Sequence, residues 1–370
     1  MAIRIAIVGG GLAGLITSLE LSKKGVPSYV FEKRTYPFHK VCGEYVSNEV
    51  VPYLKGLDIY PERFNPPAIT HFELSSVRGH LATMPLDLGG FGISRYNFED
   101  YLYEKAKSRG VKFSLETEVV AIEKRGDKYL LKNDGNIFEA DVVIGSFGKR
   151  SKIDVSMQRE FIASRSPYVG VKYHARYPHP KHIVALHNFP GGYCGVASIE
   201  GEMVNICYLA AREQLKKHGS IRDFESAVLM QNPILKKIFT EAQFTEKPLV
   251  INEISFRTKQ PVEREIMMVG DAAGMVAPIF GNGMAIAIRT GKTAGSLAAE
   301  FFHRRISRKE MEMKYASEWK TNIRNRLWLG RNVQRLFGNA ALSNVAVKMM
   351  LNSKLLAAKI IQSSHGASFS

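Results

Sequence analysis

The sequence predicts an α/β fold with a parallel sheet, an inserted antiparallel β-sheet and a C-terminal helical region. Apolar, β-branched runs at Ile3–Val8 and Ile266–Gly270 have the length of buried parallel strands. Between them, Tyr168–Leu209 contains alternating apolar and polar residues, a pattern typical of antiparallel strands. A chain of 370 residues has room for one large domain with a second built into it.

The chain opens with a strand–helix–strand unit. Ile3–Val8 is expected to be a strand, Leu12–Lys24 a helix that Gly25 ends, and Ser28–Glu32 a second strand. The apolar run at the start is short and breaks into glycines, so it indicates a strand rather than a signal peptide. This order and spacing predict a βαβ unit.

The turn between the first strand and helix carries the motif G-x-G-x-x-G. Gly9 allows the tight turn, Gly11 allows the backbone to approach a pyrophosphate, and Gly14, next to Ala13, allows the helix to pack on the strand. The helix N-terminus offers free N–H groups and a partial positive charge. Glu32 is placed to accept hydrogen bonds from ribose hydroxyls. The motif therefore predicts a Rossmann-type dinucleotide site, without distinguishing FAD from NAD.

Periodicity and turn residues predict the remaining elements. Loops with short strands are expected over 34–92, helices at 97–109, 222–231, 233–239 and 283–302, and strands at 112–115, 118–124 and 141–145, with a hairpin at 127–140. The predicted first domain is discontinuous, comprising residues 1–75, 94–160 and 259–303. The predicted substrate sheet comprises strands in 76–93 and the domain 161–258, and residues 304–370 form basic helices.

The charge is uneven along the chain. The net charge is +16, and residues 301–370 hold 13 Lys and Arg against three Asp and Glu. This basic region predicts either a solvated helical face or an anionic partner, with a membrane surface or an acidic carrier protein as candidates. No nucleic-acid module is recognisable, so nucleic acid is not expected. Residues 324–337 alternate basic and apolar side chains at helical spacing, which suits a membrane surface, a cover over an apolar pocket, or a helix packed on the sheet.

Cysteines and histidines narrow the chemistry further. Three scattered cysteines make neither a disulfide framework nor a zinc site, and they indicate a reducing, cytoplasmic compartment with membrane association as a variant. The histidines between residues 174 and 187 fit no ligand spacing, so they are expected to be packing or surface residues and no metal is predicted.

A second glycine motif identifies the cofactor. A strand ends at Gly270-Asp271, and Gly281 and Gly283 precede a helix whose second residue is Met284. This arrangement resembles the Gly-Asp motif of the geranylgeranyl reductase-like family of FAD-dependent oxidoreductases, in the para-hydroxybenzoate hydroxylase superfamily. The resemblance implies a Rossmann-type FAD-binding domain in which Asp271 binds the ribityl chain. It also implies that the following helix points its N-terminus at the flavin N1–O2 edge, where that dipole favours a reduced anion.

Other segments extend the resemblance over nearly the whole chain. The stretch Lys40–Tyr45, with Cys42 and Gly43, resembles the reductases' Cys-Gly segment near the flavin. Arg95 matches an arginine that contacts the cofactor, and Val119 matches a residue whose backbone reads the adenine. Lys33, beside Glu32, completes the predicted cofactor-binding set.

The function that the resemblance implies is a flavin-dependent reductase or dehydrogenase acting on an apolar, isoprenoid-, lipid- or polyene-like substrate. Hydride would pass through flavin N5, with NAD(P)H as the candidate external reductant. Tyr45 and Tyr193 are candidate proton donors, and Cys42 is a candidate redox thiol or a packing residue; no catalytic residue is assigned.

Two alternatives remain open. A monooxygenase would use O₂, but residues 145–151 lack the Gly-Ala-Asp-Gly segment that hydroxylases tie to NAD(P)H access. The other alternative is a non-catalytic flavin-binding protein that docks through the basic region.

Overall fold

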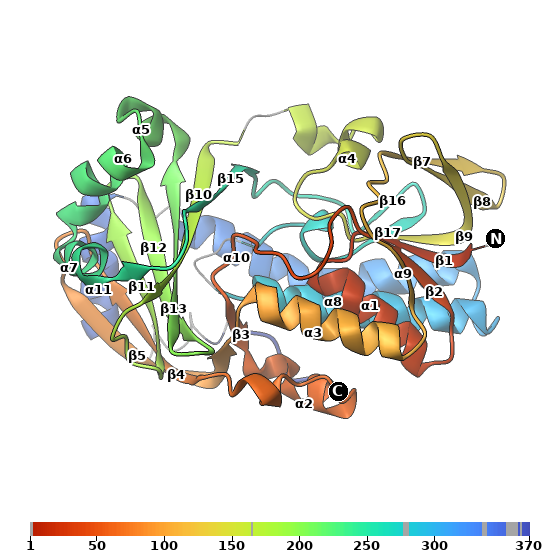
Figure 1. Cartoon of the computed structure of the whole chain (residues 1–370), viewed down its shortest axis with the longest axis horizontal. Coiled ribbons are helices and arrows are strands. Elements are labelled where there is room, and N and C mark those ends of the chain that lie inside the picture. Colours follow the sequence, from red (N-terminus) through yellow and green to blue (C-terminus); the bar gives the residue numbers. More distant parts are fainter. Residues whose placement is uncertain (1–2, 164–165, 277–280, 335–338, 353–361, 363–364) are drawn as a thin grey trace.

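The computed structural model describes residues 3–163, 166–276, 281–334, 339–352, 362 and 365–370. A parallel sheet lies at one end of the molecule and an antiparallel sheet at the other (Figure 1). The predicted fold class is confirmed: an α/β nucleotide-binding domain carries an antiparallel sheet and C-terminal helices.

The first sheet has the strand order β16-β17-β9-β1-β2-β6, and β8 joins it to β7. In the centre, β1 (Ile3–Val8) pairs in parallel with β2 (Ser28–Phe31) and β9 (Ile137–Gly145). The other members are β6 (Lys112–Ser114), β7 (Ala121–Arg125), β8 (Lys128–Lys132), β16 (Val262–Glu263) and β17 (Ile266–Met268). The carboxyl ends of β1, β2, β9 and β17 therefore meet at one edge, where ligands of such sheets bind.

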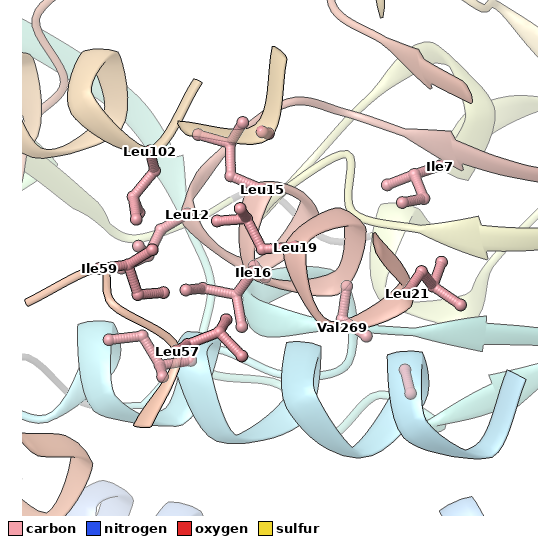
Figure 2. Packing of buried hydrophobic residues seen from close by; sticks show 14 of the residues in the cluster. Ile7, Leu12, Leu15, Ile16, Leu19, Leu21, Leu57, Ile59, Leu102 and Val269 are labelled. Carbon is pink, nitrogen blue, oxygen red and sulfur yellow. The ribbon is translucent and has the colours of Figure 1, made fainter. Parts of the chain in front are cut away.

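Three helices pack together beside this sheet. They are α1 (Leu12–Lys23), α3 (Arg95–Ser108) and α8 (Gly283–Phe302). Figure 2 shows Leu12 and Ile16 of α1 beside Leu102 of α3 and Ile59, with Val269 further along α1. Between α1 and α8 the backbones approach so closely that a Cβ on Gly291 would lie 2.6 Å from the Ala13 carbonyl oxygen. The first glycine turn and the helix after the Gly-Asp motif are thus held against each other.

The second sheet has the order β14-β10-β13-β12-β11-β4-β5-β3, and β15 also pairs with β10. Its strands are β3 (Tyr45–Ser47), β4 (Ala68–Ser75), β5 (Leu81–Gly92), β10 (Tyr168–Arg176), β11 (Ile183–Phe189), β12 (Gly192–Ile199), β13 (Met203–Ala211), β14 (Gln243–Phe244) and β15 (Leu249–Ile254). The sheet therefore begins earlier in the chain than the expected boundary at residue 75, because β3 and β4 belong to it. The region 34–92, expected to hold short strands, contains the twelve-residue strand β5.

The two faces of the second sheet have different neighbours. Alternate residues on β10 and β13, such as Val171 and Ile206, pack against Phe224 and Leu235 of the helices α5 (Arg212–Lys217), α6 (Ile221–Ala227) and α7 (Pro233–Glu241). The residues between them, including Lys172, point to the opposite face because strand side chains alternate. This opposite face, called the inner face below, meets the nucleotide-binding domain.

Short helices and the C-terminal region complete the chain. The short ones are η1 (Asn48–Val50), α2 (Val51–Gly56), η2 (Glu62–Phe64), α4 (Lys152–Ser156), η3 (Glu160–Ala163), η4 (Leu229–Gln231) and η5 (Gly270–Ala272). The C-terminal ones are α9 (Arg308–Trp319), a π-helical turn (Lys320–Arg324), α10 (Asn325–Gln334) and α11 (Ala340–Asn352). No helix in the described part of the chain is both long and apolar enough to cross a bilayer.

The predicted amphipathic stretch 324–337 lies mostly on α10, and its last three residues fall outside the described ones. Its charges do not form a single solvated face. Arg326 is buried and donates from Nη2 to Glu49 Oε1 at 3.0 Å, whereas Trp328 is exposed. This helix therefore packs on the body of the protein through both apolar and paired charged residues.

Candidate cofactor site

The turn between β1 and α1 is built as its glycines require. Gly9 has a φ of +106°, and a Cβ there would overlap the Ser146 carbonyl oxygen. A Cβ on Gly14 would overlap the Gly9 carbonyl oxygen, with Ala13 beside it in the first turn of the helix. Gly11 is the N-cap of α1 and makes no side-chain capping hydrogen bond. There is thus no room for a side chain at Gly9 or Gly14, where the turn packs on the neighbouring backbone.

Glu32 lies at the end of β2, beside this turn. Its buried carboxylate accepts hydrogen bonds from Gly10 N at 2.8 Å and Arg34 N at 3.1 Å. Thr117 N donates to the Glu32 carbonyl at 2.9 Å, which brings the buried Val119 to the same edge of the sheet. Lys33 points outward and pairs with Glu118 at 3.6 Å. These positions agree with an adenosine end at β2, and the individual roles stay predictions.

A charge cluster at the start of α1 was not foreseen from the sequence. Glu99 of α3 is buried and accepts from Leu12 N at 3.0 Å. Arg95 Nε lies 2.6 Å from Glu99 Oε1, and Lys40 Nζ lies 2.8 Å from Oε2. Burial alone would raise the pKa of Glu99, but Arg95 and Lys40 hold it below its usual range. The i,i+4 spacing of Arg95 and Glu99 is the one sequence signal that could have indicated the pair.

This cluster faces the glycine turn with more positive than negative charge. A Cβ on Gly11 would meet Lys40 Nζ at 3.2 Å and an Arg95 guanidinium nitrogen at 3.9 Å. Two cations and one carboxylate thus border the helix N-terminus. A diphosphate placed there would gain both the helix dipole and the net positive charge.

The segment that carries Cys42 and Gly43 crosses the inner face of the second sheet. Asn205 Nδ2 donates to the Cys42 carbonyl at 3.1 Å, and Lys172 Nζ donates to the Lys40 carbonyl at 3.1 Å. A Cβ on Gly43 would meet nothing within 4 Å, so open space lies beside this segment. Asn205 Oδ1 is buried without a hydrogen-bond partner among the residues that the structure describes.

Glu44 anchors the same segment. It is fully buried, with a φ of +56°, and its carboxylate bonds Lys172 Nζ, lies 2.6 Å from His174 Nε2 and accepts from Arg95 N at 2.8 Å. Burial would raise its pKa, but Lys172 and His174 together lower it. One carboxylate therefore ties the Cys-Gly segment to β10 and to the start of α3. Sequence reasoning did not identify Glu44 as a site residue.

The Gly-Asp motif lies at the carboxyl end of β17. Gly270 has a φ of +57°, and its N–H donates to Thr290 Oγ1 of α8 at 2.9 Å. The buried Lys259 donates to the carbonyl oxygens of Asp271, at 2.8 Å, and Lys149, at 2.7 Å. Burial lowers the pKa of Lys259 to about 8 and raises the pKa of Asp271 above its usual value. Lys259 thus pins two loops of the site together.

The second helix start faces Tyr45. α8 begins at Gly283 with Asn282 as N-cap and no side-chain capping bond, and Met284 is buried in its first turn. A Cβ on Gly281 would lie 2.9 Å from Tyr45 Cδ1. The Tyr45 hydroxyl donates to the Gly89 carbonyl at 3.1 Å, and burial raises its pKa. Residues 277–280 of this loop, with Pro278, lie outside the described residues.

Beyond this point the inner face of the second sheet becomes apolar. Tyr193 lies there in a cluster that also contains Leu209, Met275 from the Gly-Asp loop and Val347 from α11. The remaining members of the cluster are Leu74, Ala82, Leu186 and Ile254, with Phe72, Tyr168, Ile251, Phe256 and Met350 packed against them. An apolar wall therefore continues from the predicted flavin side toward α11.

The histidines of the second sheet are used in packing and hydrogen bonding. His187 is buried with Nδ1 3.0 Å from Ser75 Oγ, and burial lowers its pKa to about 3. In the described residues no group of three or more His, Cys, Asp or Glu side chains is placed to hold a metal.

The donor set fits FAD. Two glycine-bearing helix starts, at Gly11 and Gly283, belong to helices that pack on each other, and cations border the first. The Glu32 carboxylate lies at the end of β2, and Gly270, next to Asp271, lies between Ala13 of α1 and Ala287 of α8. One extended dinucleotide needs a helix start for its diphosphate and a second helix start for its flavin, and the structure has both.

Comparisons with known proteins agree with this geometry. Residues 2–305 match the profile of the family described as FAD binding domain. The chain is 24% identical over 335 residues to digeranylgeranylglycerophospholipid reductase 3 of Methanosphaera stadtmanae, covering 84% of this chain and 81% of the relative. It is 25% identical to 3-hydroxybenzoate 6-hydroxylase of Klebsiella oxytoca, covering 80% of each chain. A solved geranylgeranyl bacteriochlorophyll reductase-like protein of Thermoplasma acidophilum superposes with a TM-score of 0.81 at 17% identity, covering 98% of this chain and 95% of the other.

Proposed function

The chain belongs to the FAD-binding-domain family and is an FAD-dependent oxidoreductase, and on this premise we propose that it reduces an apolar, isoprenoid-like lipid. The observation that supports this substrate class most directly is the apolar inner face, where Tyr193 and Leu209 lie with Met275 of the Gly-Asp loop. These side chains are largely buried against one another, and surroundings of this composition suit a hydrocarbon chain better than a polar substrate. Reductases of geranylgeranyl lipids among the relatives agree with the same class.

Bound FAD would supply hydride transfer through N5. The chain's own residues bind and orient the cofactor. The start of α1 with Arg95 and Lys40 would hold the diphosphate, Glu32 a ribose, and Asp271 the ribityl chain. The start of α8 would place a partial positive charge beside the ring edge that becomes negative on reduction.

The polar residues of the inner face have a separate part in this proposal. Glu44 and Lys172 fix the Cys42–Gly43 segment, so that the open space beside Gly43 keeps its shape. Tyr45 is held by its hydroxyl to the Gly89 carbonyl, which orients its ring toward Gly281. Tyr45 and Tyr193 stay candidates for proton transfer, and Cys42 stays a candidate redox thiol or packing residue.

A monooxygenase is the second candidate function, because a hydroxylase is among the relatives at similar identity. Residues 145–151 bear on the choice. Ser146 N donates to the Val8 carbonyl at 2.8 Å, and Phe147 packs against a buried cluster that contains Met268. The stretch offers no aspartate, which favours a reductase over the hydroxylase manner of using NAD(P)H.

The test separates these functions in one preparation. FAD-loaded protein is photoreduced without oxygen and mixed with a phospholipid bearing geranylgeranyl chains. We expect the oxidised flavin spectrum to return, with a product heavier by two hydrogen atoms for each double bond reduced. NADH and NADPH then replace light as the reductant, to test the electron donor.

Two results would reject the proposal. Reduced protein that reacts rapidly with air and hydroxylates an aromatic acid, while leaving the lipid unchanged, is a monooxygenase. Protein that binds FAD but shows no turnover with any of these reductants and substrates is a non-catalytic flavin-binding protein.

A further inference from the structure

The C-terminal helix α11 presents apolar side chains to solvent. Leu342, Val345 and Met349 are 41%, 60% and 38% exposed, and their i, i+3, i+7 spacing places them on one side of the helix. Singly exposed apolar residues are ordinary on protein surfaces, but three in a row along one helix are a feature that needs a partner.

The other side of α11 is packed on the protein. Val347 is fully buried in the apolar cluster of the inner face, and Ser343 Oγ accepts from Val77 N at 3.4 Å. α11 contacts β4, β5 and β11, and it lies at the end of the molecule formed by the second sheet (Figure 1). Because its other side packs on the second sheet, α11 is held with Leu342, Val345 and Met349 facing solvent.

A neighbouring hairpin contacts α11. Residues 76–80 connect β4 to β5 beside Ser343, and they carry the exposed Arg78. We call Leu342, Val345 and Met349 the α11 surface.

The segment of the chain that carries this surface is basic. Residues 319–370 contain eight Lys and Arg and no Asp or Glu. Among the described ones, Lys348 is exposed on α11 and Arg78 is exposed on the adjacent hairpin. An acidic carrier protein would satisfy the charge alone, whereas an anionic bilayer satisfies both the charge and the exposed apolar side chains.

We propose that the α11 surface docks on an anionic phospholipid bilayer, with Leu342, Val345 and Met349 in the acyl boundary and Lys348 among the headgroups. This places the bilayer beside α11, whose buried side belongs to the same apolar cluster as Tyr193. The step from docking to substrate entry rests on the proposed function. The docking itself is measured without substrate, so the two proposals fail separately.

The experiment is vesicle cosedimentation of the full-length, FAD-loaded protein. The vesicles are phosphatidylcholine alone, or phosphatidylcholine mixed with phosphatidylglycerol. We expect stronger binding to the mixed vesicles, weakened by added salt because headgroup attraction is screened.

The test variant replaces all three helix residues: Leu342→Ser, Val345→Ser and Met349→Ser. A side chain of this size contributes about tenfold or more to partitioning when fully buried, so the triple variant is expected to lose at least about tenfold in affinity. A matched control replaces three apolar residues of 54–63% exposure elsewhere, and it should bind as the parent does. Its substitutions are Ile137→Ser, Val155→Ser and Met313→Ser. Unchanged FAD content and melting temperature establish that each variant is folded.

A charge variant keeps the test decisive if the triple variant does not fold. Lys348→Glu changes only an exposed side chain and is expected to lower affinity for mixed vesicles at least about fivefold. The proposal is overturned if the parent protein binds neither vesicle, or if the test and control variants bind equally. It is also overturned if the triple substitution abolishes a dimer of this chain and leaves vesicle binding unchanged.

Discussion

Replacing Glu44 by Gln should be among the most damaging single substitutions in this protein. The substitution removes one charge and hardly changes the side-chain volume. It leaves the Lys172 ammonium, 2% exposed, with only neutral acceptors among the described residues: the new amide oxygen and the Lys40 carbonyl at 3.1 Å. Breaking a buried ion pair by removing one partner costs about 3–5 kcal/mol. We therefore expect the free energy of unfolding to fall by that amount, and FAD to bind more weakly because the Cys42 segment loses its anchor.

The assay is urea unfolding at neutral pH, with a matched buried carboxylate as control. Glu225 accepts from the hydroxyls of Tyr173, at 2.7 Å, and Tyr208, at 2.9 Å, and burial raises its pKa. Glu225→Gln leaves no cation unpaired, so it should cost about 1 kcal/mol.

The contribution of Glu44 to the free energy of unfolding should depend on pH. The pKa of Glu44 is lowered in the folded protein, so its stabilisation is present above the ordinary carboxyl pKa and is lost as the pH falls through the folded-state pKa. The difference between parent and Glu44→Gln should therefore shrink in acid. In the double variant Glu44→Gln, Lys172→Met, no unpaired charge remains, and it should be more stable than Glu44→Gln alone. Equal costs for Glu44→Gln and Glu225→Gln, or no recovery in the double variant, would refute the reasoning.

Three further outcomes follow from the geometry. Gly14→Ala places a Cβ on the Gly9 carbonyl, so it should lower the free energy of unfolding by about 1–3 kcal/mol and lose most of the FAD that the parent retains on purification. Gly56 has open space around it, so Gly56→Ala should change the free energy of unfolding by less than about 0.5 kcal/mol. Glu32→Gln should weaken FAD binding about tenfold in a fluorescence titration, through loss of charge-assisted hydrogen bonds; an unchanged affinity would remove Glu32 from the site. Burial lowers the pKa of His187 to about 3, so between pH 6.5 and 3 the unfolded state takes up a proton that the folded state does not. This group should therefore lower the parent's free energy of unfolding by about 1.4 kcal/mol for each pH unit of acidification in that range. Unfolding measurements on His187→Asn should lack that part of the slope.

Local signals predicted the nucleotide-binding half well. The helix Gly283–Phe302 and the strand Ile3–Val8 have the predicted bounds, and the FAD-binding family that the two glycine motifs indicated is confirmed. These features depend on residues close in sequence, where glycine conformation and apolar runs decide the structure. Helix α3 begins two residues earlier than predicted, because Ser94 caps it and its Oγ accepts from Asn97 N at 3.1 Å.

Strands of the second sheet were predicted in 76–93, but the length of β5 was not, because its composition signals turns. Pro85 and the adjacent Gly89 and Gly90 lie within it, and such residues normally weaken strands. In the fold these positions serve close packing: a Cβ on Gly90 would overlap the Tyr45 ring. That requirement comes from a strand far along the chain and cannot be read locally.

The polar contacts of the site could not be predicted from the sequence for the same reason. Glu44 meets Lys172 and His174 only because β10 lies across the Cys-Gly segment, and Glu99 reaches Leu12 only because α3 packs beside α1. Pairing between charges so distant in sequence depends on sheet register and helix packing. A single sequence indicates which residue types are present, but not which of them meet.

The interleaved strand order also has a consequence for biosynthesis. β9 ends at Gly145, but its parallel neighbour β17 is not made until Ile266, after the whole second sheet. β8 already pairs with the first part of β9, but until β17 is made the last residues of β9, around Ile144 and Gly145, leave an unpaired backbone edge, and such an edge invites pairing with other chains. A ribosome that stalls before this point would release a fragment with an open sheet edge, so stalled products of this chain should be aggregation-prone and rapidly degraded.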